Sequence, residues 1–169
     1  MNTEASENDD AGSQQVGRKL QLVNAGSTQF GIFAEEISAI VAWQEPTPLP
    51  HAPESVLGVV SIQGRMLTVL DLATLPVREA TLSDGPRNAP GYIIALRGDE
   101  QLALAIDASG ETIQLTPHES MTDSITKQET VTTPVLGVLQ REGIQIKILN
   151  LKGLFPTAIQ GRRRRQRRF

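Results

Sequence analysis

The chain has no cysteine, only 4% aromatic residues and no long hydrophobic segment. Without cysteine it has no disulfide, thiolate nucleophile or cysteine-ligated zinc site, and this composition fits a reducing compartment. No apolar run approaches the roughly 18 residues that a membrane-spanning helix needs. Residues 1–16 are polar and acidic, with neither the basic nor the apolar segment of a signal peptide, so we expect a cytoplasmic protein.

Catalytic motifs are also absent from the sequence. It contains no glycine-rich nucleotide-binding loop, no nucleophile elbow and no helical zinc-protease motif. The two histidines, His51 and His118, each follow a proline in an expected loop, where side chains are usually exposed to solvent. A metal site needs several converging ligands, and nothing in the sequence indicates them. We therefore expect neither an enzyme nor a bound cofactor or metal.

The net charge of −3 hides a strong asymmetry. Six arginines lie among the last eight residues: Arg162, Arg163, Arg164, Arg165, Arg167 and Arg168. Of the 16 basic residues these six leave ten elsewhere, against 19 acidic residues, so the rest of the chain carries −9. Such a tail is compatible with a solvated end, with weak contact to anionic lipid or nucleic acid, or with pairing to the acidic N-terminal residues.

An internal repeat is the most informative feature of the sequence. Val56–Leu72 (VLGVVSIQGRMLTVLDL) recurs in weaker form at Val135–Leu151 (VLGVLQREGIQIKILNL). A constant offset of 79 residues aligns Gly58 with Gly137, Gly64 with Gly143 and Asp71 with Asn150. Two copies are too few for a solenoid, so the repeat predicts two related lobes.

The hydrophobic pattern predicts short strands joined by turns. Besides the hairpin at 56–72, we expect strands at 20–24, 29–34, 92–96, 102–106, 135–139 and 144–148. Residues 35–43 suit either a helix or a strand. Four prolines exclude regular structure from 45–53. Residues 116–134 suit a long loop or a short helix. The segments that begin at Phe30 and Leu102 also resemble each other loosely. The pattern favours an all-β barrel or sandwich, and the repeat favours two small barrels, with a boundary in the surface connection at 76–91.

The hairpin resembles the signature of the CheW-like domain, which runs approximately G-V-x-N-L-R-G-x-x-x-P-V-x-D-L. Residues 58–72 stand here as GVVSIQGRMLTVLDL. The likeness extends over about 18–156 and includes Phe30-Gly31-Ile32, the proline-containing loop, Asp107 and the closing Ile148–Leu151. It implies an all-β fold of two small five-stranded SH3-like β-barrels packed side by side, with short helical turns. The lobes would span about 18–80 and 90–156, between a disordered acidic tail (1–17) and a basic tail (157–169).

The resemblance also implies a function. Members of this family are non-enzymatic adaptors that couple the cytoplasmic tip of a methyl-accepting chemoreceptor to the regulatory domain of a CheA-type histidine kinase. Such an adaptor has no small-molecule substrate and would be recruited to membrane-associated receptor arrays. The family's Asn, Arg and Pro are replaced here by Ser61, Gln63 and Thr68, and a glutamate common in the family aligns with Ala39. These departures fit a divergent adaptor, such as one that serves type IV pilus motility. The alternative is a protein that binds nucleic acid or anionic membrane through its arginine tail.

Six residues are expected at partner-binding surfaces on the strength of the resemblance. They are Ile37, Gly58 and Thr112 in a receptor-binding groove between the lobes, and Gln63, Gly64 and Arg65 at the hairpin turn. Three of these residues can also be explained without a partner. Ile37 suits a buried core side chain, Gly64 a turn with positive φ, and Arg65 a solvated charge.

Two further residues have competing interpretations. Asp71 follows an apolar strand and is favoured as the cap of a following turn over a partner contact, and Asn150 at the matching position supports this choice. Trp43 suits either an exposed binding anchor or a side chain that packs against the proline-containing loop.

Overall fold

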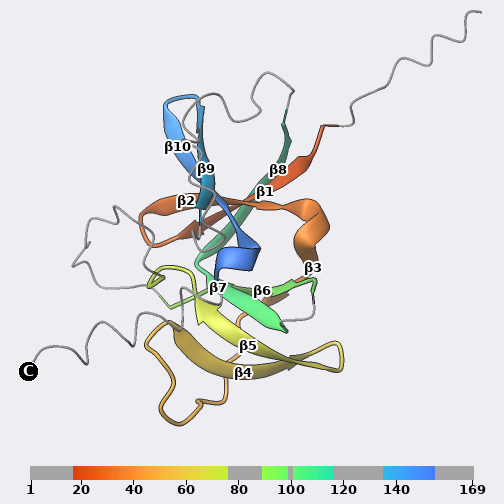
Figure 1. Cartoon of the computed structure of the whole chain (residues 1–169), viewed down its shortest axis with the longest axis vertical. Coiled ribbons are helices and arrows are strands. Elements are labelled where there is room, and N and C mark those ends of the chain that lie inside the picture. Colours follow the sequence, from red (N-terminus) through yellow and green to blue (C-terminus); the bar gives the residue numbers. More distant parts are fainter. Residues whose placement is uncertain (1–16, 76–88, 99–100, 116–134, 155–169) are drawn as a thin grey trace, which may run out of the picture.

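The computed structural model describes residues 17–75, 89–98, 101–115 and 135–154, and within them ten strands form two five-stranded sheets (Figure 1). The strands are β1 (Lys19–Ala25), β2 (Thr28–Phe33), β3 (Ile37–Ala42), β4 (Val56–Ile62), β5 (Arg65–Asp71), β6 (Tyr92–Leu96), β7 (Leu102–Ile106), β8 (Ala108–Gln114), β9 (Val135–Arg141) and β10 (Ile144–Leu149). A 3-10 helix, η1 (Ala34–Glu36), joins β2 to β3, and a helical turn at 151–154 follows β10. The predicted all-β fold is confirmed.

The two sheets each combine strands from both halves of the chain. Sheet A has the order β8-β1-β2-β10-β9, and sheet B has the order β3-β6-β7-β5-β4. The chain passes from sheet A to sheet B through η1 and returns between β7 and β8 (Figure 1). The sheets therefore do not coincide with the expected lobes at 18–80 and 90–156. Each half gives two strands to one sheet and three to the other, because the parallel pairs β2–β10 and β5–β7 join strands distant in sequence.

The internal repeat is confirmed in strand register and in backbone conformation. The cross-strand partners of β4 and β5 recur in β9 and β10 at the same offset, with a bulge at the same point of each hairpin. Both turns contain two residues with positive φ, at 51° and 76° for Gln63-Gly64 and at 52° and 78° for Glu142-Gly143. Positive φ at both central residues is the requirement of a type I′ turn. β2 and β7 also occupy equivalent places, since each runs parallel to the second strand of a hairpin.

Three hydrophobic clusters stabilise this arrangement, one inside each SH3-like barrel and one between the sheets. The cluster inside sheet A consists of Leu20, Leu22, Phe33, Ile113, Leu139, Ile146 and Ile148. The cluster inside sheet B consists of Val60, Ile62, Leu67, Val69, Ile93, Ala95, Ala103 and Ala105. The third, here called the central cluster, draws buried residues from β1, β2 and β10 of sheet A and from β5, β6 and β7 of sheet B.

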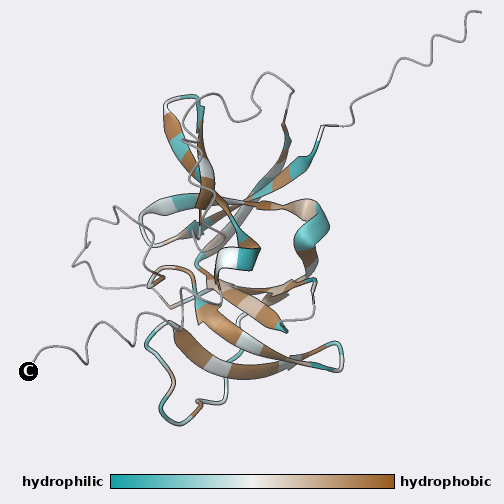
Figure 2. Cartoon of the chain, in the orientation of Figure 1, coloured by the Kyte–Doolittle hydropathy of each residue, from teal (hydrophilic) through white to brown (hydrophobic). Residues whose placement is uncertain are grey.

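β7 shows how the central cluster determines the sequence pattern. Leu102, Leu104 and Ile106 belong to the central cluster, whereas Ala103 and Ala105 belong to the cluster inside sheet B. The alternation of large and small apolar residues thus separates two buried faces, and the small side chains fit the interior of the barrel. Figure 2 shows the hydrophobic residues concentrated along the strands, while η1 between the sheets is hydrophilic.

Some local expectations differ from the structure. Residues 35–43 form the end of η1 followed by β3, which resolves the ambiguity in favour of a strand. β8 was not expected, because its sequence ASGETIQ is polar and only Ile113 is buried. Ile144 alternates with Ile146 and Ile148 as predicted, but it lies at the hairpin tip and is 52% exposed. The expectations for 1–16, 76–88, 116–134 and 155–169 lie outside the described residues.

We expect Leu104→Ala to lower the free energy of unfolding by about 2–5 kcal/mol, because Leu104 is fully buried (0% exposed) in the central cluster. The matched control Met66→Ala removes a side chain that is 58% exposed and should change stability by no more than about 0.5 kcal/mol. Urea unfolding followed by circular dichroism measures both. Since the central cluster joins the sheets, a single transition is expected, and two separate transitions would contradict this view of the core.

Candidate partner-binding surfaces

Acidic and histidine side chains do not gather into a metal centre in the part of the chain that the structure describes, where no group of three or more potential ligands is found. None of the described helical segments has the length and hydrophobicity needed to cross a membrane. The polar residues of interest lie at the hairpin tips, along the edges of the sheets and where the chain crosses between them, and their exposure ranges from exposed to buried.

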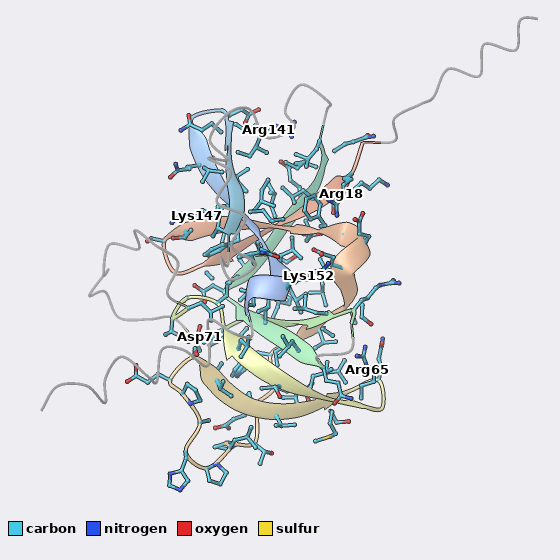
Figure 3. The ribbon with its side chains drawn as sticks, in the orientation of Figure 1. Arg18, Arg65, Asp71, Arg141, Lys147 and Lys152 are labelled. Atoms are coloured by element: carbon cyan, nitrogen blue, oxygen red, sulfur yellow. The ribbon has the colours of Figure 1, made fainter. Side chains whose placement is uncertain are left out.

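The tip of the β4–β5 hairpin brings together three of the six predicted residues. Gln63 and Gly64 are exposed in the turn, and Arg65 begins β5 at the same end of the hairpin (Figure 3). The Arg65 Nη2 donates a hydrogen bond of 3.1 Å to the carbonyl oxygen of Gly98, which follows β6. This bond uses one of the five guanidinium donors and ties the tip to the neighbouring strand connection. Arg65 is half-buried, and this bond orients its guanidinium.

The equivalent tip of the β9–β10 hairpin has different chemistry. The offset of 79 residues places Glu142 at the position of Gln63 and Ile144 at the position of Arg65. Ile144 is one of the more exposed large hydrophobic side chains, and it replaces a charged group that is hydrogen-bonded in the first copy. The repeat therefore gives two similar backbones with unlike surfaces.

Gly58 lies beneath the proline-containing loop in the structure. It is buried with φ of 144°, and a Cβ added there would overlap the carbonyl group of Thr47. Thr47 and Val59 exchange two backbone hydrogen bonds of 2.9 Å, so the loop covers the outer edge of β4 at this point. The close approach of the loop explains why glycine occupies the position.

Thr112 belongs to a polar network on sheet A. Its hydroxyl donates a hydrogen bond of 2.8 Å to Gln21 Oε1 on the neighbouring strand β1. Gln21 is buried, and its amide nitrogen donates to the carbonyl oxygen of Gly110 at 2.7 Å and to the hydroxyl of Ser109 at 3.2 Å. Gln21 was not singled out from the sequence, although a glutamine between two leucines in an apolar strand is a signal of a buried polar group.

Ile37 lies where the chain crosses between the sheets, at the start of β3. It is half-buried and packs against the central cluster, which agrees with the structural alternative. The neighbouring backbone is held by Arg97, whose Nε donates to the Ile37 carbonyl at 3.0 Å and whose main-chain nitrogen donates to the Glu36 carbonyl at 2.8 Å. Nearby, the Arg18 guanidinium pairs with the Glu35 carboxylate. We call these five residues the η1 junction.

Arg18 is engaged on two sides. Its guanidinium carbon lies 3.4 Å from the centroid of the Phe33 ring, and its Nε and Nη2 both donate to Glu35 Oε1. An arginine over an aromatic face gains a cation–π interaction in addition to its ion pair. Glu36 is one of the four charged residues of the junction, and its Oε2 receives no hydrogen bond from that guanidinium.

Glu36 has an unusual environment. Its Oε2 is out of contact with solvent and accepts no hydrogen bond from the residues described. Burial raises the pKa of the Glu36 carboxyl, and the charge of Glu35 raises it further, whereas Arg18 and Lys152 act in the opposite direction. Sequence reasoning missed this residue, because its burial depends on the crossing of the chain between the two sheets.

An apolar strip runs along β3 and β6 beside the junction. Ile40 is 38% exposed and pairs with Ile94, and Ala42 pairs with Tyr92, which is 41% exposed. Directly paired residues share a face of a sheet, and Ile94 belongs to the central cluster, so the strip lies on the face of sheet B that turns toward sheet A. Among the described strands β3 pairs only with β6, which makes it an edge of sheet B.

The remaining predicted residues have structural explanations where they are described. Asp71 is buried and its Oδ1 accepts a hydrogen bond of 3.1 Å from the main-chain nitrogen of Ala73, which confirms the predicted cap. Trp43 is half-buried against the cluster inside sheet B. His51 is exposed in the proline-containing loop. His118 and the six arginines of the tail lie outside the described residues.

Comparison with known proteins finds relatives over most of the chain. The family model of the CheW-like domain matches residues 19–159. The chemotaxis protein CheW of Rhizobium meliloti (strain 1021) is 27% identical over 142 residues, which cover 83% of this chain and 89% of that protein. The chemotaxis protein CheW of Bacillus subtilis (strain 168) is 28% identical over 110 residues, which cover 64% and 67%.

A solved structure has the same fold. The scaffolding protein TtCheW from Thermoanaerobacter tengcongensis aligns with a TM-score of 0.65 and 22% sequence identity, over 82% of this chain and 92% of that chain.

We expect Gly58→Ala to destabilise the protein by at least about 3 kcal/mol, because an unfavourable φ and a clash with the backbone of Thr47 act together. Gly64→Ala is the matched control. Gly64 also has positive φ, but its Cβ would meet nothing within 4 Å, so a cost of about 1 kcal/mol is expected. Chemical denaturation measures both variants, and equal losses would show that the loop does not impose glycine at position 58.

We expect Glu36→Gln to stabilise the folded chain near neutral pH, because it removes a buried carboxylate whose Oε2 lacks a hydrogen bond. A raised pKa in the folded state means that folding favours the protonated form, so the wild type loses stability as the pH rises through that pKa. The difference in stability between the variant and the wild type should therefore disappear at pH values below the ordinary pKa of glutamate, where the carboxyl is protonated in both the folded and the unfolded state. Thermal unfolding at a series of pH values tests this, and a variant that is less stable at neutral pH would refute it.

Proposed function

The chain belongs to the CheW-like domain family, and from this membership we propose that it is a non-enzymatic scaffold in chemotaxis signalling. The observation that carries the proposal is the family match over residues 19–159, together with the chemotaxis proteins that the chain resembles over most of their length. The presence of several unlike exposed surfaces on one pair of packed sheets supports it, since a scaffold must engage more than one partner.

The partners we propose are the cytoplasmic tip of a chemoreceptor and the regulatory domain of a CheA-type histidine kinase. The scaffold would act without chemistry of its own, because holding two proteins together raises their effective concentration for each other. Such a protein would be cytoplasmic and located at membrane-associated receptor arrays. The departures at Ser61, Gln63 and Thr68 favour a divergent partner set, for which type IV pilus motility is one proposed output.

The kinase surface we propose is the tip of the β4–β5 hairpin, with Gln63, Gly64 and Arg65. Two features of the structure support this choice. The tip is exposed, and Arg65 is held in position by its bond to Gly98 while four of its donors are not used by that bond. Arginine is enriched at binding hot spots because it combines a fixed donor geometry with an apolar stem.

The receptor surface we propose lies where the two sheets meet, near Ile37 and Thr112. Ile37 borders the central cluster, and the apolar strip on β3 and β6 continues from it. An exposed apolar strip next to polar groups is typical of a protein interaction site. Gly58 would contribute indirectly, since it allows the loop over β4 to close on the sheet.

A second candidate function rests on the arginines of the tail, six of the last eight residues. In that case the barrels would be a support, and the tail would bind anionic lipid or nucleic acid by charge. Deleting residues 161–169 separates the two proposals. The deletion should leave binding to the kinase domain intact and remove any binding to anionic vesicles or heparin.

We expect Gln63→Asp to raise the Kd for the kinase regulatory domain from the same organism by about tenfold, because it adds an unpaired charge to the interface. Aspartate tolerates the positive φ of this position, so the fold should be unchanged. Isothermal titration calorimetry on the full chain measures the effect. The control Gln63→Asn keeps the turn conformation without the charge and should bind like the wild type. Equal affinity of all three proteins would remove the tip from the kinase interface, and lack of binding by the wild type would remove the proposed kinase partner.

A further inference from the structure

The η1 junction contains an acceptor that no donor of the described residues satisfies. Glu36 Oε2 is shielded from solvent without a hydrogen bond. The guanidinium groups beside it bond other acceptors, since Arg18 Nε and Nη2 donate to Glu35 Oε1 and Arg97 Nε donates to the carbonyl oxygen of Ile37. A carboxylate oxygen in this state is costly, because it has given up water without gaining another partner.

The charges that face Glu36 come from three elements. Arg18 precedes β1, Glu35 precedes Glu36 in η1, and Lys152 lies on the turn at 151–154, which Figure 3 places between the two sheets. Arg18 and Glu35 neutralise each other as an ion pair. Lys152 is exposed and donates no hydrogen bond to Glu36 Oε2. Glu36 as a whole is half-buried, so a rotation of its side chain would bring this oxygen to the surface, where it can meet a positive group supplied from outside the chain.

The position of this oxygen next to the apolar strip defines what kind of partner fits. Ile37 follows Glu36 directly, and Ile40 and Tyr92 are exposed farther along the same face of β3 and β6. A partner segment that covers this strip must present apolar side chains. At the end of the strip where β3 begins, the same segment must present a positive charge.

We propose that Glu36 receives a lysine or arginine side chain of the chemoreceptor helix that covers the apolar strip. This inference rests on the proposed function and names the chemistry of its receptor surface. A guanidinium or ammonium group gives the outward-turned carboxylate a charge-assisted hydrogen bond, and the receptor helix shields the pair from water. Binding then removes a penalty that the free chain carries, so Glu36 acts as a specificity determinant for a basic residue of the receptor.

The test is a titration of the soluble cytoplasmic hairpin of a chemoreceptor from the same organism into the full chain. Wild type, Glu36→Gln and Glu45→Gln are compared. Glu45 is exposed beyond the other end of β3, so its variant makes the same change in net charge away from the junction. We expect Glu36→Gln to raise the Kd at least tenfold, while its melting temperature is equal to or higher than that of the wild type. Glu45→Gln should bind like the wild type.

A double-mutant cycle identifies the partner residue. Each lysine and arginine of the receptor hairpin tip is changed to glutamine and measured against both wild type and Glu36→Gln. One receptor position should show strong non-additivity with Glu36→Gln, and the others should be additive.

The outcomes separate this inference from the function on which it rests. Unchanged or tighter binding by Glu36→Gln, or equal weakening by Glu36→Gln and Glu45→Gln, overturns the role of Glu36 and leaves the receptor as a partner. Strict additivity at every receptor position also overturns it. If the wild type does not bind the receptor hairpin, the proposed receptor partner fails, and the role of Glu36 fails with it.

Discussion

The hydrophobic contact between the two sheets is the constraint on which the rest of the structure depends. β6 and β7 have both faces buried, one inside their own barrel and one in the central cluster. Each half of the chain supplies strands to both sheets, so neither sheet is complete without the other half. The chain must therefore cross the contact twice. The first crossing puts the charged residues of η1 beside an apolar interface, and this is why the η1 junction combines an ion pair, backbone contacts and a half-buried carboxylate.

The repeat separates the requirements of folding from those of recognition. The two hairpins share register, bulge and turn conformation, and their inward residues supply the two barrel cores. Their tips differ, since Gln63 and Arg65 in one copy correspond to Glu142 and Ile144 in the other. Side chains at a tip contribute little to either core, so their identity is free to follow a partner. A duplicated fold can thus acquire two unlike surfaces without loss of stability.

The features that sequence reasoning predicted are those encoded locally. The turns at Gln63-Gly64 and Glu142-Gly143, the alternating strands and the cap at Asp71 each depend on residues within a few positions of one another, and the structure confirms them. The interleaving of the sheets depends on parallel pairing between distant strands, for which a single sequence carries no direct signal. β8 was missed because an edge strand with one buried residue lacks the alternation that identifies a strand. The internal repeat favoured a pair of small barrels, and the resemblance to the CheW-like domain gave each barrel five strands.

The candidate surfaces also divide into features encoded locally and features that depend on distant parts of the chain. Gln63, Gly64 and Arg65 were expected at a partner surface from the family resemblance, and the structure brings them together at one tip, although their role stays a prediction. The reason for glycine at position 58 is the close approach of a loop, which a sequence does not reveal. The burial of Glu36 likewise depends on the residues that surround the crossing at η1. Natural sequences satisfy most local rules, and residues that break one without a compensating contact are expected at functional sites. Glu36 meets that description in the free chain, because glutamine would fill the same space without a charge. Retaining a buried acid beside an exposed apolar strip is understandable when the missing contact belongs to another protein.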